Sequence, residues 1–203
     1  MCIRDRLTND NIRGVKVLDT GFFGKVVLAD TVGLCLKDLK LSDGDDYKSV
    51  SVQVAMKMLK PNVSKSTQEA FEKECKFMSR LDHPNVVRLL GVCTTDPSRF
   101  IMMEFMERGD LNDYLTNFKT IISEGVPKEK EILVSTLVYM CVQIASAMNY
   151  LVLRNFIHRD LAARNCLVGP ENLIKIADFG MSRNLYESHY CSYAHFFSCS
   201  CLR

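Results

Sequence analysis

A cluster of polar residues enclosed by two short apolar segments is the feature that most constrains the fold of this chain. Residues 158–165 (HRDLAARN) lie between Phe156-Ile157 and Cys166-Leu167-Val168. Polar side chains beside buried strands cost free energy unless each one finds a partner. The pattern therefore predicts a loop between two strands, with side chains that serve a functional site.

A second polar segment, Asp178-Phe179-Gly180, follows an apolar segment at 173–177 and begins 18 positions after Asp160. A carboxylate and an amide carbonyl brought together are suitable ligands for a hard cation such as Mg²⁺. For a single tripeptide of this kind, an ordinary turn is the alternative. Two polar loops, each next to a short apolar strand, favour a shared site instead.

Two weaker signals lie in the first part of the chain. Gly21 and Gly24 occupy a turn between apolar strands, where glycine lets the backbone approach phosphates, although an ordinary hairpin has the same pattern. Lys57 stands in an otherwise apolar strand, so its charge needs a partner or a ligand, unless it reaches the surface. Glu74, in the next predicted helix, is the candidate partner, although a lone acidic residue on a helix is usually solvated.

The order of the predicted elements indicates an α+β protein with two lobes. Strands are expected first, around a single helix, and helices dominate after a joint near residues 104–109. Predicted strands cover 15–29 (two strands around the glycine turn), 50–59, 86–92, 100–105 and 173–177; predicted helices cover 67–81, 110–118 and 135–153; residues 41–48 are a predicted loop. Asp110 is expected to cap the second helix.

Composition excludes several classes of protein. The formal net charge of +2, from 26 basic and 24 acidic residues, gives no reason to expect a nucleic-acid partner. No apolar run reaches the roughly 18 residues of a transmembrane helix, and residues 1–6 are not a signal peptide, so the chain alone is expected to be soluble. The nine cysteines lack paired spacing. The five that stand singly are expected to be buried, reduced thiols: Cys35, Cys75, Cys93, Cys141 and Cys166.

Together, the glycine turn, Lys57, the HRD…N loop and the DFG turn resemble, in order and spacing, the signature of the protein kinases. The loop at 160–165 resembles that of tyrosine kinases, because it has Ala162 at the position where serine/threonine kinases usually carry a lysine. Segments 73–81, 106–112 and 177–186 resemble the discoidin domain receptor tyrosine kinases. The resemblance implies a bilobal kinase fold, with a mostly antiparallel β N-lobe that contains one helix and an incomplete helical C-lobe.

The same resemblance implies that ATP and Mg²⁺ are bound and that phosphate is transferred to a protein tyrosine. The implied catalytic residues are Asp160 (the base), Arg164, Asn165, Lys57 (on the α/β-phosphates) and Glu74 (its partner). Asn165 and Asp178 would hold Mg²⁺. The nucleotide would contact Leu18, Gly21, Gly24, Val26, Ala55, Lys57, Met103, Glu104, Met106 and Leu167. The implied regulatory residues are Arg159, Phe179, Tyr186 and Tyr190, the tyrosines being phosphorylation sites that could pair with Arg159.

The chain also departs from the kinase pattern. Asp19 replaces the first glycine of the loop and places a negative charge close to the phosphates. The expected division is a leader unrelated to the family (1–11), an N-lobe (12–106), a partial C-lobe (107–190) and an unrelated tail (191–203). With part of the C-lobe missing, His158, Phe179 and the long helix are expected to expose apolar surface.

Two functions remain open at the level of sequence. The parent protein is expected to be an active, dimeric receptor tyrosine kinase, with this domain on the cytoplasmic side of the plasma membrane and held there only through the parent. The alternative for the chain as written is a truncated, inactive fragment that at most binds nucleotide or partners. A dinucleotide-binding domain is excluded, because the glycine turn opens a strand and not a helix.

Overall fold

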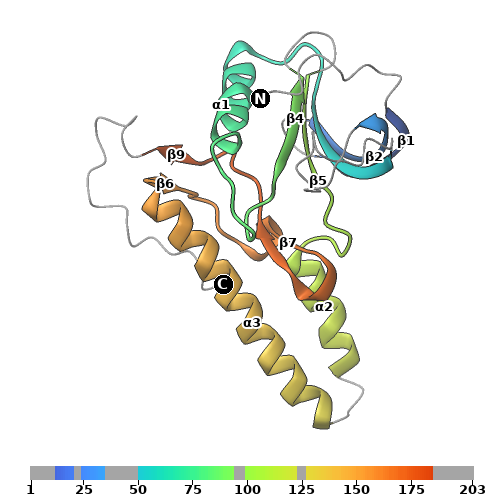
Figure 1. Cartoon of the computed structure of the whole chain (residues 1–203), viewed down its shortest axis with the longest axis vertical. Coiled ribbons are helices and arrows are strands. Elements are labelled where there is room, and N and C mark those ends of the chain that lie inside the picture. Colours follow the sequence, from blue (N-terminus) through green and yellow to red (C-terminus); the bar gives the residue numbers. More distant parts are fainter. Residues whose placement is uncertain (1–11, 21–23, 35–49, 94–98, 123–126, 185–203) are drawn as a thin grey trace.

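The computed structural model describes residues 12–20, 24–34, 50–93, 99–122 and 127–184 (Figure 1). A sheet and one helix form the upper part of the molecule, and two further helices with short strand pairs form the lower part. This arrangement confirms the predicted α+β, bilobal kinase fold. The predicted loop at 41–48, Gly21, Tyr186, Tyr190, the leader and the tail lie outside the described residues.

The upper part is built on a five-stranded antiparallel sheet in the order β1-β2-β3-β5-β4. Its strands are β1 (Ile12–Thr20), β2 (Gly24–Leu34), β3 (Val50–Leu59), β4 (Leu89–Cys93) and β5 (Phe100–Glu104). Side chains alternate between the two faces of a strand. Val54 and Met56 therefore enter one apolar cluster, while Ala55 and Lys57 point to the opposite face, where the predicted nucleotide residues lie.

Helix α1 (Lys65–Met78) packs beside this sheet (Figure 1). The predicted range was 67–81; the helix begins earlier because the Ser64 side chain accepts a hydrogen bond from Thr67 N (3.2 Å), which caps it. The buried face carries Phe71, Cys75 and Met78 as the spacing predicted. The same face also buries Glu74, so the lone acidic residue is not solvated.

The strand predicted over 86–92 begins only at Leu89. Val86 and Val87 are buried outside the sheet, and Val87 N donates to Ile176 O (3.0 Å) in the lower part of the molecule. Their apolar character thus reflects contact with the lower part and not membership of β4.

Two helices dominate the lower part. Helix α2 (Leu111–Ile122) is capped as predicted, since Asp113 N donates to Asp110 Oδ1 (3.0 Å). Helix α3 (Pro127–Leu153) begins well before the predicted Ser135. Its first turns contain KEKE, which breaks the apolar periodicity but not the helix, and Pro127 suits the first helical position.

Short elements carry the two polar segments between these helices and the sheet. Strand β6 (Phe156–Ile157) pairs with β9 (Arg183–Asn184), and β7 (Cys166–Val168) pairs with β8 (Ile174–Ile176), both antiparallel. Single-turn 3₁₀ helices cover Ala163–Asn165 (η2) and Pro170–Asn172 (η3). Residues 158–165 therefore run from β6 to β7, and residues 177–182 run from β8 to β9, which places the two loops side by side.

Gln143 fixes α3 to these strands. It is buried, its Oε1 accepts from Asn85 Nδ2 (3.0 Å) and Ile174 N (2.9 Å), and its Nε2 donates to Asn172 O (3.0 Å). Such a satisfied network orients a helix that apolar contacts alone would leave free to slide. The polar residue that interrupts the apolar run at 135–153 is thus a structural link.

The opposite face of α3 is apolar and exposed. Val138 and Val142 are 57% and 60% exposed, and the stripe continues through Val134, Cys141 and Val152. The expected exposure of the long helix is therefore confirmed. The same expectation is wrong for His158 and Phe179, which are only 1% and 2% exposed. Phe179 belongs to the main apolar cluster, and its ring contacts that of His158.

By length and composition, Val134–Leu153 is the one helix within the described residues that could cross a membrane. No such segment was expected from the apolar pattern of the sequence. The helix also packs through Met140, Ala147 and Leu151 into the core, as a soluble helix does, so this is weak support for a span.

Among the described cysteines, Cys75 and Cys166 are buried as expected, and burial raises their thiol pKa values to about 12 and about 11, respectively. Both remain protonated and unreactive at neutral pH. The expectation is wrong for Cys141, which is exposed on α3.

We predict that the exposed stripe of α3 promotes self-association. The double variant Val138→Glu/Val142→Lys places a favourable charge pair one helical turn apart on this face and should lower the associated fraction in sedimentation velocity, with little change in thermal stability. Asn117→Lys, which adds a charge at an exposed polar position of α2 and not on the stripe, is the control and should leave association unchanged. Equal association of all three proteins would contradict the prediction.

Candidate active site

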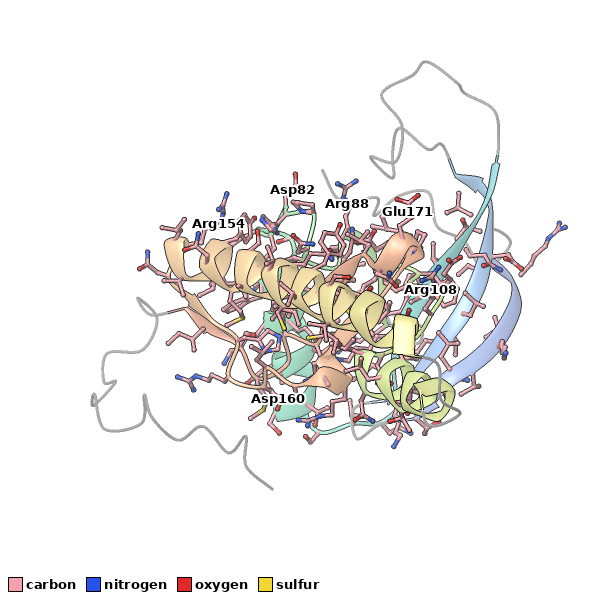
Figure 2. The ribbon with its side chains drawn as sticks, turned by 90° about the horizontal axis from the view of Figure 1, so that it is seen from below. Asp82, Arg88, Arg108, Arg154, Asp160 and Glu171 are labelled. Carbon is pink, nitrogen blue, oxygen red and sulfur yellow. The ribbon has the colours of Figure 1, made fainter. Side chains whose placement is uncertain are left out.

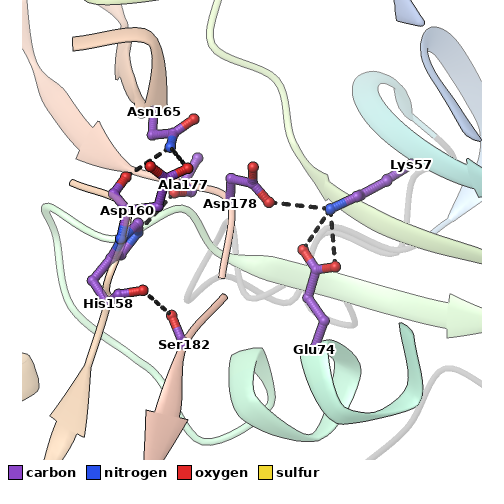
Figure 3. A network of polar contacts seen from close by, with 8 residues as sticks. All are labelled: Lys57, Glu74, His158, Asp160, Asn165, Ala177, Asp178 and Ser182. Carbon is purple, nitrogen blue, oxygen red and sulfur yellow. Dashed lines mark hydrogen bonds and ion pairs between the residues drawn. The ribbon is translucent and has the colours of Figure 1, made fainter. Parts of the chain in front are cut away.

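The site is built around Lys57 of β3 (Figure 3). Lys57 Nζ lies 2.8 and 2.9 Å from the two carboxylate oxygens of Glu74 on α1, and 3.3 Å from Asp178 Oδ1. The Glu74 side chain is 5% exposed and that of Lys57 15%, whereas that of Asp178 is 50% exposed. One cation therefore joins a buried carboxylate to a carboxylate that is open to a ligand.

Electrostatics keep Lys57 charged. Burial lowers the pKa of its ammonium group, but the charges of Glu74 and Asp178 and their hydrogen bonds outweigh burial, so the net shift is upward. Burial raises the pKa of Glu74, and the Lys57 charge opposes that effect without cancelling it. The raised pKa of Lys57 favours the charged pair, whereas the raised pKa of Glu74 favours a protonated carboxyl group. Because both Glu74 oxygens lie at hydrogen-bond distance from one ammonium group, we take the charged pair as the state near neutral pH.

Asp160 has both of its carboxylate oxygens engaged by neighbours from its own loop. Arg164 Nη2 donates to Oδ1 (2.6 Å), and Asn165 Nδ2 donates to Oδ2 (3.0 Å) and to the backbone carbonyl of Asp160 (2.7 Å). The Asp160 side chain, labelled in Figure 2, remains 35% exposed. The loop thus presents an oriented, accessible carboxylate with a cation beside it.

His158 connects the loop that carries Asp160 to the segment that carries Asp178. Its Nε2 lies 3.0 Å from the Ala177 carbonyl, which can only accept, and its Nδ1 accepts from Asp160 N (3.3 Å). These two bonds require the neutral ring with its proton on Nε2. Burial lowers the pKa of His158, and the opposing effects of Ala177, Asp178 and Asp160 are smaller.

The backbone of the site is unusual at two non-glycine positions. Arg159 has φ of 71° and Asp178 has φ of 59°, both in the left-handed region that such residues rarely occupy. Conformations of this kind persist only where surrounding contacts hold them, and they concentrate at functional sites. Phe179 supplies one such contact, since its ring meets that of His158 edge-on, with 5.1 Å between centroids.

The donor set at Asn165 and Asp178 fits Mg²⁺. The Asn165 amide nitrogen is committed to Asp160, which leaves the amide oxygen for a cation, and Asp178 presents an exposed carboxylate. Within the described residues, no group of three His, Cys, Asp or Glu side chains forms a cluster that could hold a metal ion. A site of two oxygen ligands still suits Mg²⁺, which keeps several waters and takes its other ligands from substrate phosphates.

Four residues expected at the nucleotide lie on one face of the sheet. Val26 is opposite Lys57 in the β2–β3 ladder, and Ala55 is opposite Met103 in the β3–β5 ladder. Residues directly opposite in a ladder share a face, as do residues two apart in a strand. The structure therefore brings Val26, Ala55, Lys57 and Met103 together on the face that carries Lys57.

The remaining expected nucleotide residues border this face. Leu18 is exposed near the end of β1, and Leu167 lies in β7 of the lower part. Gly24 begins β2, where an added Cβ would lie 1.7 Å from Met58 O, so the close approach of β3 alone requires glycine there.

The joint between the two parts holds a bond that the sequence analysis missed. Glu104, predicted to use its backbone, directs its side-chain Oε1 at Lys175 Nζ of β8 (2.6 Å) and at Arg88 N (2.7 Å). The Glu104 N–H donates to Arg88 O (3.1 Å), and Met106 O accepts from Gly109 N (3.3 Å). Lys175, one charge in an apolar strand, carried the same signal as Lys57.

The comparisons with known proteins agree with this geometry. The sequence model of the protein tyrosine and serine/threonine kinase family matches residues 12–196. The chain belongs to this family. It is 49% identical over 183 residues to the class II receptor tyrosine kinase of Geodia cydonium, which covers 89% of this chain. It is 42% identical over 190 residues to the rat epithelial discoidin domain-containing receptor 1, covering 88% of the chain.

A further relative is the transforming tyrosine-protein kinase Abl of Abelson murine leukemia virus, 46% identical over 148 residues, which are 73% of this chain and 18% of that protein. The predicted resemblance to receptor tyrosine kinases and to the discoidin receptors is thereby confirmed. The kinase chain spans only 30% of the Geodia protein and 20% of the rat receptor. Members of this family use ATP and Mg²⁺.

We predict a pH-dependent loss of stability caused by His158. Its pKa is lowered by folding, so below the ordinary value of about 6.5 the unfolded chain takes up a proton that the folded chain refuses, and stability falls as the pH falls. His158→Gln should flatten the plot of unfolding free energy against pH between about 5 and 7, by at most about 1.4 kcal/mol per pH unit.

The measurement is urea unfolding at a series of pH values. It is best made on a His83→Gln background, because the pKa of His83 is also lowered, by burial and by Arg154 and Lys175. Equal slopes with and without His158 would show that the ring titrates normally in the folded protein.

Proposed function

We propose that the domain binds Mg²⁺ and ATP at the Lys57 face of the sheet and transfers the γ-phosphoryl group of ATP to a tyrosine hydroxyl of a protein. The observation that carries the proposal is the contact of Lys57 with both Glu74 and Asp178, next to the Asp160–Asn165 loop. Structural ion pairs are common, but this one places a charged amine and an exposed carboxylate where two polar loops meet.

On the nucleotide side, Lys57 would exchange its contact with Asp178 for the α/β-phosphates while Glu74 holds the ammonium in place. Asn165 and Asp178 would hold Mg²⁺, which neutralises phosphate charge when bound. Leu18, Val26, Ala55 and Leu167 would enclose the adenine, the Glu104 carbonyl and Met106 N–H would bond its edge, and Met103 would limit the pocket behind it. Gly21 and Gly24 would leave room for the phosphates.

On the acceptor side, Asp160 would accept the proton of the tyrosine hydroxyl while that oxygen attacks the γ-phosphorus and the bond to the β-phosphate oxygen breaks, releasing ADP. Arg164 stabilises the Asp160 carboxylate before the substrate arrives. Little covalent chemistry is asked of the protein, and positioning with charge neutralisation supplies most of the rate. The tyrosine preference rests on Ala162 and on the tyrosine-kinase relatives.

The proposal extends to the longer protein of which such domains are part. By similarity to the receptor relatives, the domain would lie on the cytoplasmic side of the plasma membrane in a dimeric receptor, with lobes at 12–106 and 107–190. Tyr186 and Tyr190 would be phosphorylated and would pair with Arg159. The packing of Phe179 would differ between the active and inactive states of the Asp178–Phe179–Gly180 turn. Residues 1–11 and 191–203 would lie outside the two lobes.

A second candidate is a domain that binds nucleotide without transferring phosphate. Asp19 favours it, because an exposed carboxylate at the end of β1, bonded to Thr20 N (2.6 Å), places negative charge beside the glycine turn. Two experiments separate the candidates.

Binding is tested by thermal shift with a non-hydrolysable ATP analogue and Mg²⁺. The unfolding midpoint should rise, because a ligand at a hundredfold excess over Kd stabilises the folded state by about 2.7 kcal/mol. Lys57→Met should abolish the shift. Lys60→Met, an exposed lysine at the end of the same strand, is the matched control and should retain it. If both variants keep the shift, Lys57 does not contact the nucleotide.

Transfer is tested with radiolabelled ATP and a tyrosine-containing polymer. Asp160→Asn should lower kcat by about 10²-fold to 10⁴-fold, the usual contribution of a general base, without weakening nucleotide binding. Asp113→Asn, on the exposed side of α2, should behave as the wild type. Nucleotide binding without any transfer by the wild-type chain would favour the second candidate.

A further inference from the structure

Ser182 lies between the Asp178–Phe179–Gly180 turn and strand β9. Its backbone N–H donates to Phe179 O (3.0 Å), which closes the turn on itself. Its hydroxyl donates to the His158 carbonyl (3.1 Å), in the loop that carries Asp160 (Figure 3). This one residue therefore contacts both the turn of the proposed metal ligand and the loop of the proposed base.

The Ser182 hydroxyl makes the bond to the opposite strand that the Ser182 N–H does not make. The β6–β9 ladder pairs Phe156 with Asn184 and Ile157 with Arg183, so the next position sets His158 opposite Ser182. At that position the Ser182 N–H is directed into the turn, and the side chain supplies the bond across. His158 is buried, so without this donor its carbonyl would lose the partner that the structure shows.

A second bond completes a clamp around the turn. His158 Nε2 donates to Ala177 O (3.0 Å) on the other side of Asp178, so both ends of the turn are tied to the same residue. The clamp encloses Asp178, whose φ of 59° is unfavourable for a non-glycine residue and needs its surroundings to hold it. The direction of the Asp178 carboxylate therefore depends on bonds that its own side chain does not make.

We propose that Ser182 is a positioning residue, whose hydroxyl holds the Asp178 turn against the catalytic loop and so orients Asp178 for Mg²⁺. The identity of the ligand, Mg²⁺, rests on the proposed function, whereas the clamp rests on the geometry alone. Arg183 and Asn184 pair with β6 through the backbone, whereas Ser182 uses its side chain to reach the His158 carbonyl.

The first test measures Kd of the full chain for adenylyl imidodiphosphate across a titration of Mg²⁺, and Kd for adenosine, which has no phosphates. Ser182→Ala should weaken Mg²⁺-dependent binding about fivefold, the effect of one net hydrogen bond, and leave adenosine binding unchanged. Ser182→Thr keeps the hydroxyl and should restore the wild-type value. Ser79→Ala, which removes an exposed hydroxyl bonded to Lys76 O (2.9 Å), is the matched control.

The second test needs no ligand. Hydrogen exchange of the free chain should show about fivefold faster exchange of the Asp160 and Ser182 amides in Ser182→Ala, since both are bonded within the clamp. The amides of α1 should exchange as in the wild type.

The outcomes separate the two proposals. Unchanged Mg²⁺ dependence in Ser182→Ala, or an equal loss of adenosine affinity, overturns the positioning role. A wild-type chain without Mg²⁺-dependent binding counts against the proposed function, and the exchange rates then decide the clamp: faster exchange in Ser182→Ala alone supports it, and equal rates overturn it.

Discussion

The buried charge pair of Lys57 and Glu74 is the interaction on which the arrangement of this domain depends. Removing one member would leave an uncompensated charge in the core, which costs several kcal/mol on the scale of buried pairs. The pair therefore fixes the distance between β3 and α1. Because Lys57 also contacts Asp178, it extends that constraint to the lower part of the molecule, so the sheet, the helix and the turn that carries Asp178 share one electrostatic centre.

Much of this centre could be predicted from the sequence. Lys57 in an apolar strand and polar loops beside short strands are conflicts between residue type and environment, and such conflicts mark sites in a chain whose other residues agree with their environment. The apolar spacing of Phe71, Cys75 and Met78 likewise predicted the buried face of α1.

Other features depend on contacts between distant residues, which local patterns do not contain. The start of α3 is polar and shows no periodicity, so its helix was predicted too short. Val86 and Val87 read as strand because their burial, against β8, resembles that of a strand. The bond between Glu104 and Lys175 joins residues far apart in the chain, and so does the ring contact of His158 with Phe179, both of which are buried.

The close approach at Gly24 limits what mutagenesis can teach about the nucleotide loop. Any larger residue there would collide with the Met58 carbonyl, so a variant would lose function by displacing β3 whether or not phosphates ever touch that glycine. An inactive Gly24 variant is therefore ambiguous between a folding defect and a binding defect. A substitution at Val26 is more informative, because Val26 lies opposite Lys57 in the ladder and its side chain shares that face.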